Sequence, residues 1–432
     1  MPSADYRKNI CIFDLQHDSI DLNYELFLAK RFTTSKKYKS SISSPIIKIA
    51  ISAIALGMVM MLITVATGVG LQQKIRDKIS VFKGHVQVVN YDNNFSEATQ
   101  KPISKYQDFY PDFNAVPGVK SVQVFATKAG VIRTEKDFEG VVLKGVGQTY
   151  DWTNFVPYLV AGRPPDFSGQ RSNEVLLSKT VSDRLGLVLN DTFDTYFLRE
   201  NQLALPNRRV FKVVGVYNSG FQEFDKSFFI GDIRQIQKLN KWQESQVGGF
   251  EILLDDFEEL ESKGAAIYHS IPPTLDSHTI VENYPAIFEW LHLFDTNMYV
   301  IIGIMILVAG INMITALLVL VLERTQSIGL LKALGATNWS VRKVFLYNAS
   351  YLILRGLFWG NLVGLTLLAL QSYFGMIPLD PETYYVSQAP VSISISHVAL
   401  LNLGTLFLCL FMLLIPSIIV TKISPATSLK FE

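Results

Sequence analysis

The chain carries little charge for its length. Only 18% of its 432 residues are Asp, Glu, Lys or Arg, whereas soluble domains carry about a quarter. The net charge is only +1, so the chain lacks the excess of positive charge that would indicate nucleic acid as a partner. Cysteine is scarce too. Cys11 lies near the start of the chain and Cys409 in an apolar run, so the sequence offers neither a disulfide framework nor a cysteine metal site.

The signatures of common catalytic sites are also missing. No GxxxxGK[ST] phosphate loop occurs, so we do not expect this chain to hydrolyse ATP, and neither HExxH nor GxSxG is present. The acid pairs at 255–256 and 258–259 begin a helical pattern, where carboxylates suit the positive end of the dipole. The sequence therefore predicts a protein that is not an enzyme, with no catalytic residue and no cofactor or metal bound by this chain.

What the chain does have is four long apolar runs. Each exceeds the ~20 residues that a membrane-crossing helix needs, and only the third contains a charge, Arg355. We predict an α-helical membrane protein with four transmembrane helices and a large α+β domain between the first two. The predicted order is a tail (1–21), a basic segment (22–45), TM1 (46–71), the large domain (72–297), TM2 (298–322), a short segment (323–343), TM3 (344–370), a loop (371–397), TM4 (398–420) and a tail (421–432).

The basic residues of the short segments predict the orientation. Lys and Arg gather before TM1, within 323–343 and after TM4, whereas 371–397 has none. Because basic loops stay in the cytoplasm, we expect both termini and 323–343 to be cytoplasmic and the large domain to lie outside. The stretch 22–32 reads either as an amphipathic helix on the inner membrane face or as a plain basic anchor.

The large domain shows two kinds of pattern. About 150–230 is rich in turns and short strands, which predicts a β-rich insert within a split α+β lobe. A polar hairpin tip at 198–209 within that insert, including Leu205, Pro206 and Arg208, reads either as a solvent loop or as a docking arm. The lobe itself is predicted from strand, helix and strand patterns at 84–92, 103–115 and 118–126, and again at 248–256, 257–269 and 277–284.

The segment 323–343, ERTQSIGLLKALGATNWSVRK, is a short amphipathic stretch between two apolar runs. Ile328, Leu331 and Leu334 can form one apolar stripe of a helix. Lys332 suits the negative end of that helix, and Gly335 can end it in the left-handed conformation. The stripe fits either a groove on a cytosolic partner or the lipid headgroups.

This segment resembles the coupling helix of the FtsX/MacB-type (type VII) ABC permeases, with its ERTxEIGxLRALGA pattern. GINMITALLVLVLER, which contains Asn312, is similar to the family's second helix. GRPPDFSGQRSNEVLLSKTVSDRLGLVLNDTF resembles a run of the MacB-like periplasmic core, and PSIIVTKISPATSLKFE resembles the closing sequence. The lack of a fused ATPase and the size of the outer domain make the lipoprotein-releasing (Lol-type, LolC/LolE) permease subunits the best match.

The resemblance implies a function. The chain would be a multi-pass permease of the bacterial inner membrane that extracts lipoproteins and releases them toward the outer membrane. It implies a cytosolic, LolD-like P-loop ATPase that binds ATP and Mg²⁺, a second permease chain, the lipoprotein cargo, a periplasmic lipoprotein carrier and membrane lipid as partners. The alternatives are an FtsX-like relay of ATPase state to a periplasmic partner, without transport, and a MacB-like efflux permease.

It also implies roles for individual residues. The residues expected to couple the chain to the ATPase are Glu323, Arg324, Ile328, Leu331, Lys332, Leu334 and Gly335. Ser327 stands where the family often has Glu, which weakens the case for an ionic contact there. Hairpin residues 198–209 occupy the place of a carrier-docking hook, but they cannot be matched to it one by one.

Two further expectations concern the membrane segments. Cargo acyl chains are expected in a cavity lined by Met58, Met61, Leu62 and Val65, because methionine adapts to variable shapes; ordinary packing is the other reading of these side chains. Arg355, near mid-bilayer, is expected to face the helix bundle or a wet cavity, with Asn361 and Asn402 as partners.

Overall fold

The computed structural model describes residues 25–29, 43–92, 100–135, 137–198 and 206–422. The chain divides into two compact units, which we describe separately. Residues 1–63, 300–367 and 394–432 make up the first unit, and residues 64–299 and 368–393 make up the second. The predictions for 1–21, for most of 22–45, for Leu205 and for the closing tail from 423 on lie outside the described residues.

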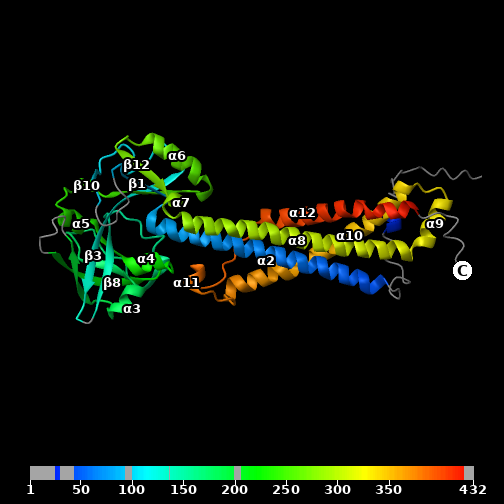
Figure 1. The fold of residues 1–432 in the computed structure, drawn as a ribbon, viewed down its shortest axis with the longest axis horizontal. Helices are drawn as coiled ribbons and strands as arrows, with labels where there is room; N and C mark the ends of the chain where they lie inside the picture. The colour runs from blue at the N-terminus through cyan, green and yellow to red at the C-terminus, as the bar shows by residue number, and fades with distance from the viewer. Residues whose placement is uncertain (1–24, 30–42, 93–99, 136, 199–205, 423–432) are drawn as a thin grey trace, which may run out of the picture. The chain divides into compact units, whose positions relative to one another are not determined.

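The four apolar runs all lie in long helices (Figure 1). These helices are α2 (Ser43–Lys83), α8 (Pro285–Glu323), α10 (Asn338–Phe374) and α12 (Ile395–Leu414). Each is long and apolar enough to cross a membrane, which confirms the predicted number of spans. Two helices extend well beyond their apolar runs, because charged residues end the hydropathy signal without ending the backbone hydrogen bonding. The first unit also holds α9 (Thr325–Ala333) and the 3₁₀ helix η4 (Pro416–Lys422).

Helices α2 and α10 pack closely through a stripe of glycines. Gly356, Gly360 and Gly364 recur every four residues, so they lie on one face of α10. A Cβ added at Gly360 would lie 2.7 Å from Met58 Cβ and 2.8 Å from the Ala55 carbonyl oxygen. Side chains of α2 therefore fill the space that the glycines leave, as in small-residue helix contacts of membrane proteins.

The second unit is built on one ten-stranded sheet. Its order is β12-β1-β11-β3-β4-β9-β6-β8-β5, with β7 paired to β3 and β8, and β2 pairs with β10 separately. The pairs β4–β9 and β6–β8 are parallel and the others antiparallel. The strands are β1 (Val86–Asn90), β2 (Ile103–Ser104), β3 (Val119–Arg133), β4 (Phe138–Val146), β5 (Leu159–Gly162), β6 (Glu174–Ser178), β7 (Thr192–Phe197), β8 (Asn207–Tyr217), β9 (Phe228–Asp232), β10 (Gln246–Val247), β11 (Gly249–Leu254) and β12 (Leu275–Thr279).

Short helices lie at the ends and on the faces of this sheet. Figure 1 shows α6 beside β12 at one end and α3 near β8 at the other. Together with the sheet, they form the α+β domain predicted between the first two spans. The helices are η2 (Val156–Tyr158), α3 (Lys179–Leu185), α4 (Gln222–Ser227), α5 (Ile233–Asn240), η3 (Phe257–Glu259), α6 (Leu260–Ser270) and α7 (Ile280–Asn283). A further helix of the second unit, α11 (Pro381–Tyr384), belongs to the loop that follows α10.

Most of the predicted strands are confirmed, but the helix predicted at 103–115 is wrong. That stretch holds β2 and turns. Phe109, Phe113 and Val116 are all buried in the core, and their spacing imitates one face of a helix. Pro111 in their midst lacks the N–H that a helix interior needs. The β-rich stretch predicted at 150–230 shares the ten-stranded sheet with the flanking strands, through the parallel pair β4–β9.

Candidate functional site

The segment between the second and third apolar helices is helical, and it ends as the sequence predicts. Helix α9 closes at Gly335, whose φ is +96°. The Ala336 N–H donates to the Leu331 carbonyl (3.0 Å) and the Gly335 N–H to the Lys332 carbonyl (3.0 Å). These two bonds make a Schellman motif, in which a left-handed glycine satisfies the last carbonyls of a helix. The predicted role of Gly335 as the end of the helix is confirmed.

The apolar stripe of α9 does not lie wholly on the surface. Ile328 is buried at 1% exposure, and Leu331 is half-buried. Leu330 (53%) and Leu334 (77%) are the large apolar side chains exposed there. The three-residue spacing of Ile328, Leu331 and Leu334 does not reveal this difference, because the inward face of α9 depends on the packing of neighbouring helices. Ile328 thus holds the helix in place, while Leu330 and Leu334 present an apolar surface.

The polar residues around α9 differ from one another in exposure. Glu323 is exposed and Arg324 is half-buried, at the junction of α8 and α9. Lys332 is half-buried too, and burial lowers the pKa of its ammonium below the ordinary value. At the start of α10, the Ser340 hydroxyl donates to Glu25 Oε1 (3.0 Å). The helical stretch at 25–29 therefore packs beside the segment that follows α9.

Arg355 lies on an exposed face of α10, so it does not face the helices of its own chain, and the expected wet cavity stays a prediction. Its guanidinium lies 4.5 Å from the ring centroid of Tyr351, one turn earlier. Side chains lean toward the N-terminus of their helix, which explains why Arg355 meets Tyr351. Asn361 and Asn402 bond to each other instead, at 2.7 and 3.0 Å, and link α10 to α12. Asn312 is half-buried in α8.

The residues expected to line a cargo cavity are packed inside the chain. Met58, Met61 and Leu62 are 0% exposed and Val65 is 8% exposed. Met58 and Leu62 lie against the glycine stripe of α10, which agrees with ordinary packing, the other reading of these side chains; a cargo cavity at them stays an untested prediction. The opposite face of α2 carries the exposed apolar side chains, among them Leu56 (63%) and Met60 (41%). The GxxxGxxxG pattern at 356–364 was a signal for this packing, although it does not say which helix fills it.

A buried ion pair ties the end of α2 to the sheet. Lys144 Nζ of β4 lies 2.8 Å from both carboxylate oxygens of Glu251 in β11, and it also donates to the carbonyl oxygen of Phe82 in α2. Both charged side chains are at most 5% exposed. The Phe82 ring is itself enclosed by aromatic side chains, with centroids 5.0 Å from Phe155 and 5.4 Å from Phe224. We call Phe82, Lys144 and Glu251 the joint.

The sequence itself contains a signal for the joint. Lys144 is the single charge of the apolar stretch VVLKGV in β4, and Glu251 is the single charge of β11, GFEILL. Charges are buried when they are paired, so two such residues of opposite sign are candidates for each other. The joint connects the last turn of α2 to two strands of the sheet.

His85, next to the joint, leads to a prediction about pH. Its Nδ1 accepts the Leu254 N–H (2.8 Å), and burial, followed by the charge of Lys120, lowers its pKa to about 4. The unfolded chain keeps a pKa near ~6.5, so it binds the proton first. We expect the stability that His85 contributes to be complete above ~pH 6.5 and to fall by up to ~3 kcal/mol as the pH drops toward 4.

The measurement is thermal unfolding of the full-length protein in detergent between pH 7 and 4. His85→Gln should lose less stability over this range than the wild type. His269→Gln, which changes an exposed histidine of α6, should keep the wild-type slope. Equal slopes in His85→Gln and the wild type would contradict the assignment.

Only part of the predicted docking hairpin can be placed. Leu205 lies outside the described residues. Pro206 and Arg208 are exposed, and Arg208 Nε donates to Asp194 Oδ1 (2.8 Å) across the β7–β8 pair. Arg208 thus stabilises the base of the hairpin, and the structure leaves a docking role open to test.

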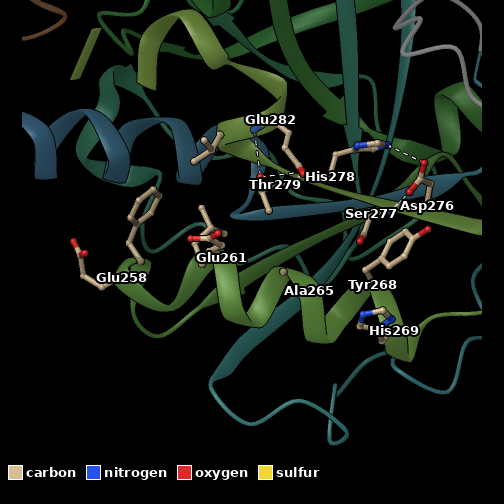
Figure 2. Close-up of a pocket in the computed structure, with 14 residues that line it drawn as sticks. Glu258, Glu261, Ala265, Tyr268, His269, Asp276, Ser277, His278, Thr279 and Glu282 are labelled. Carbon is tan, nitrogen blue, oxygen red and sulfur yellow. Dashed lines mark hydrogen bonds and ion pairs between the residues drawn. The ribbon is translucent and has the colours of Figure 1, made fainter. Parts of the chain in front are cut away.

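A hollow of 820 Å³ lies between α6 and the edge strand β12 (Figure 2). In β12, the N–H groups of odd-numbered residues point away from β1. The even-numbered neighbours show this, because the Ile280 N–H donates to the His85 carbonyl and the Thr274 carbonyl accepts from the Tyr91 N–H, just outside the two ends of β1. Carboxylates satisfy two of these groups: Asp276 Oδ1 accepts from Ser277 (2.9 Å), and Glu282 Oε2 accepts from Thr279 (2.7 Å). Such a protected edge disfavours pairing with another strand.

Comparison with known proteins assigns both parts of the chain. Residues 49–267 match the family MacB-like periplasmic core domain, and residues 299–425 match FtsX-like permease C-terminal. The chain is 21% identical over 417 residues to the lipoprotein-releasing system transmembrane protein LolE of Haemophilus influenzae. The alignment covers 94% of this chain and 99% of that protein. The chain is 23% identical to LolC of Neisseria meningitidis, with the same coverage.

Other similar proteins align with a smaller share of this chain. An uncharacterized ABC transporter permease, YknZ of Bacillus subtilis, is 22% identical over 70% of this chain and 77% of its own length. Among solved structures, the periplasmic region of MacB from Actinobacillus actinomycetemcomitans aligns with 47% of this chain and 91% of that chain. Its sequence identity is 15% and its TM-score 0.32.

Proposed function

Because the chain belongs to the FtsX/MacB-type family of ABC permeases, we propose that it extracts lipoproteins from the inner membrane and releases them toward the outer membrane. The alignment with lipoprotein-releasing permeases carries this proposal, since it spans 94% of this chain and 99% of both relatives. The chain is a multi-pass membrane protein with a periplasmic domain, and as a permease subunit of this family it is not the ATPase.

Energy would come from a separate cytosolic P-loop ATPase that binds ATP and Mg²⁺. We place its contact on α9, in an orientation with both termini and α9 in the cytoplasm. The exposed Leu330 and Leu334 would enter an apolar groove on that partner. Helix α9 follows α8 almost directly, so a movement imposed on α9 would pass into α8. No covalent bond of the cargo changes in this cycle.

Two permease chains, identical or related, would enclose the acyl chains of the cargo. We assign this contact to the exposed apolar faces of the first two spans, which include Leu56 and Met60 of α2 and Ile304 and Val308 of α8. These four replace the buried residues expected from the sequence. An exposed methionine such as Met60 suits acyl chains of different length, because its side chain is flexible.

Reconstitution tests the function directly. Proteoliposomes would contain the full-length chain, its cognate ATPase, a second permease chain where the complex requires one, and a labelled triacylated lipoprotein. ATP-dependent transfer of the label to a soluble periplasmic carrier would support extraction. Stimulated ATP hydrolysis without transfer would indicate a relay like FtsX, and ATP-dependent movement of a small molecule without lipoprotein transfer would indicate efflux. Either result would refute the proposal.

The double variant Leu330→Asp/Leu334→Asp tests the docking surface. Two charges in a desolvated apolar groove should weaken ATPase binding, and we expect ATP-dependent release to fall at least ~10-fold, the effect of about 1.4 kcal/mol. Co-purification of the ATPase measures the contact. Val160→Asp/Val188→Asp, which changes two exposed valines of the large domain, is the matched control. Normal co-purification with the α9 variant would rule out this surface.

A further inference from the structure

A second hollow, separate from α9 and from the cargo faces, lies where α2 leaves its apolar run. It measures 470 Å³, within the usual range of ligand pockets. One wall is the stretch of α2 from Gly70 to Lys78, and the other is the end of α10 with the loop 386–392. All of these residues belong to the second unit. We call this hollow the collar pocket.

The walls of the collar pocket are bonded to each other. The Ser392 N–H donates to the Ala66 carbonyl (2.9 Å), and the Ser392 hydroxyl donates to Gln73 Oε1 (3.0 Å). At Gly70 a Cβ would lie 2.9 Å from the Pro390 carbonyl oxygen, so the loop lies directly on the helix backbone. On the other side, Gln371 Nε2 donates to the Ala389 carbonyl (3.0 Å). The pocket is therefore formed before any ligand enters.

The pocket carries a net positive charge. Lys74 and Lys78 stand one helical turn apart on the same wall, and Asp77 is the only carboxylate among the lining residues. Lys78 Nζ donates one hydrogen bond, to the Tyr385 carbonyl (2.7 Å), and within the described residues neither lysine has an ion-pair partner within 4.0 Å. Both ammonium groups thus retain N–H donors, and the one excess positive charge among the lining residues matches the charge of one phosphodiester. Burial lowers the pKa of Lys78 to about 8, and the charge of Asp225, which is not a lining residue, acts in the opposite direction.

The position of the pocket identifies the source of such a group. The charge-free run of α2 ends at Leu71, and at ~1.5 Å per residue Lys74 and Lys78 lie ~5–10 Å beyond it. A bilayer of ~40–45 Å contains ~30 Å of hydrocarbon, so each headgroup layer is ~5–8 Å deep. Lys74 lies within that depth, and Lys78 lies just beyond it, where its long side chain can reach back to the phosphates. A basic side chain at that depth meets lipid phosphates on either side of the membrane.

We propose that the collar pocket binds the phosphodiester headgroup of an anionic phospholipid, through Lys74 and Lys78. Hydroxyl and amide groups of the loop supply further donors to the headgroup. The bound lipid bridges α2 and the loop that follows α10, and it stabilises their contact. This site is independent of the cargo, so it stands or falls separately from lipoprotein release.

The test uses the full-length protein, purified and delipidated in mild detergent. Short-chain phosphatidylglycerol is titrated, and binding is followed as the rise in thermal midpoint, because a ligand of the folded state stabilises it. We expect roughly fivefold weaker binding for Lys74→Gln or Lys78→Gln, and roughly 25-fold for the double variant, as the loss of one basic contact each implies. Lys179→Gln and Lys238→Gln, in α3 and α5, should bind as the wild type does.

Two further arms identify the ligand and guard against misfolding. Inorganic phosphate at equal concentration should neither raise the midpoint nor displace the lipid; displacement would show a free-phosphate site and overturn the lipid assignment. Phosphatidylcholine should bind more weakly than phosphatidylglycerol, and equal binding would also overturn it. If the double variant does not fold, Lys74→Gln decides alone, because Lys74 is exposed. Wild-type affinity in that variant would refute the site.

Discussion

Replacing Lys144 with methionine is expected to destabilise the protein more than any exposed charge change. The variant removes the charged partner of the buried Glu251 carboxylate, to which the Gln87 amide still donates (3.2 Å), and it leaves the Phe82 carbonyl without the Lys144 ammonium. Breaking a buried pair in this way costs ~3–5 kcal/mol. For a domain of this size that lowers the thermal midpoint by roughly 10 °C.

Two companion variants separate charge burial from general damage. Lys144→Met/Glu251→Met removes both charges, and we expect it to regain much of the lost stability, because apolar side chains often replace a buried pair without loss. Lys179→Met breaks the exposed pair with Asp183 and should change the stability by less than ~1 kcal/mol. Midpoints for Lys144→Met within the error of the wild type would show that the joint does not hold α2.

The joint variant also has a functional readout. If ATP-driven movement passes between the spans and the large domain, a loosened end of α2 should reduce lipoprotein release at temperatures well below the midpoint. ATP hydrolysis itself, which takes place on the partner, should change less than release. A variant that lowers both rates in proportion would show that the joint contributes stability only.

Replacing Gly360 with leucine is expected to force α2 and α10 apart. The new Cβ would meet Met58 Cβ at 2.7 Å and the Ala55 carbonyl oxygen at 2.8 Å, and a backbone atom cannot move aside as a side-chain tip can. Overpacking of this kind costs ~1–3 kcal/mol, and we expect the upper end of that range here. Thermal unfolding in detergent and the yield of the assembled complex measure the effect.

The chain offers matched controls within its other spans. Gly303 in α8 and Gly404 in α12 have no atom within 4 Å of an added Cβ, so Gly303→Leu and Gly404→Leu should fold with near wild-type stability. All three variants add the same side chain to a membrane helix, so hydrophobicity and helix propensity are held equal. If Gly404→Leu were as unstable as Gly360→Leu, close helix packing would not be the cause.

Local chemistry made several features predictable from the sequence. Four apolar runs with a single charge among them specify spanning helices, because the backbone and side chains of such runs are stable in hydrocarbon only as helices. Gly335 ends α9 because glycine adopts a positive φ without a steric penalty. Alternating side chains indicated β1, whereas the four-residue spacing of Phe109 and Phe113 imitates one face of a helix, although both lie outside any helix.

Other features depend on contacts between distant segments. The sequence by itself determined that α9 is a short amphipathic helix and that Gly356, Gly360 and Gly364 form a stripe, since both follow from local spacing. Only the tertiary structure decided that Ile328 faces inward, that Met58 fills the glycine stripe and that Lys144 meets Glu251. The physical reason is that burial and charge pairing are set by whichever surface lies opposite, and that surface comes from a remote part of the chain.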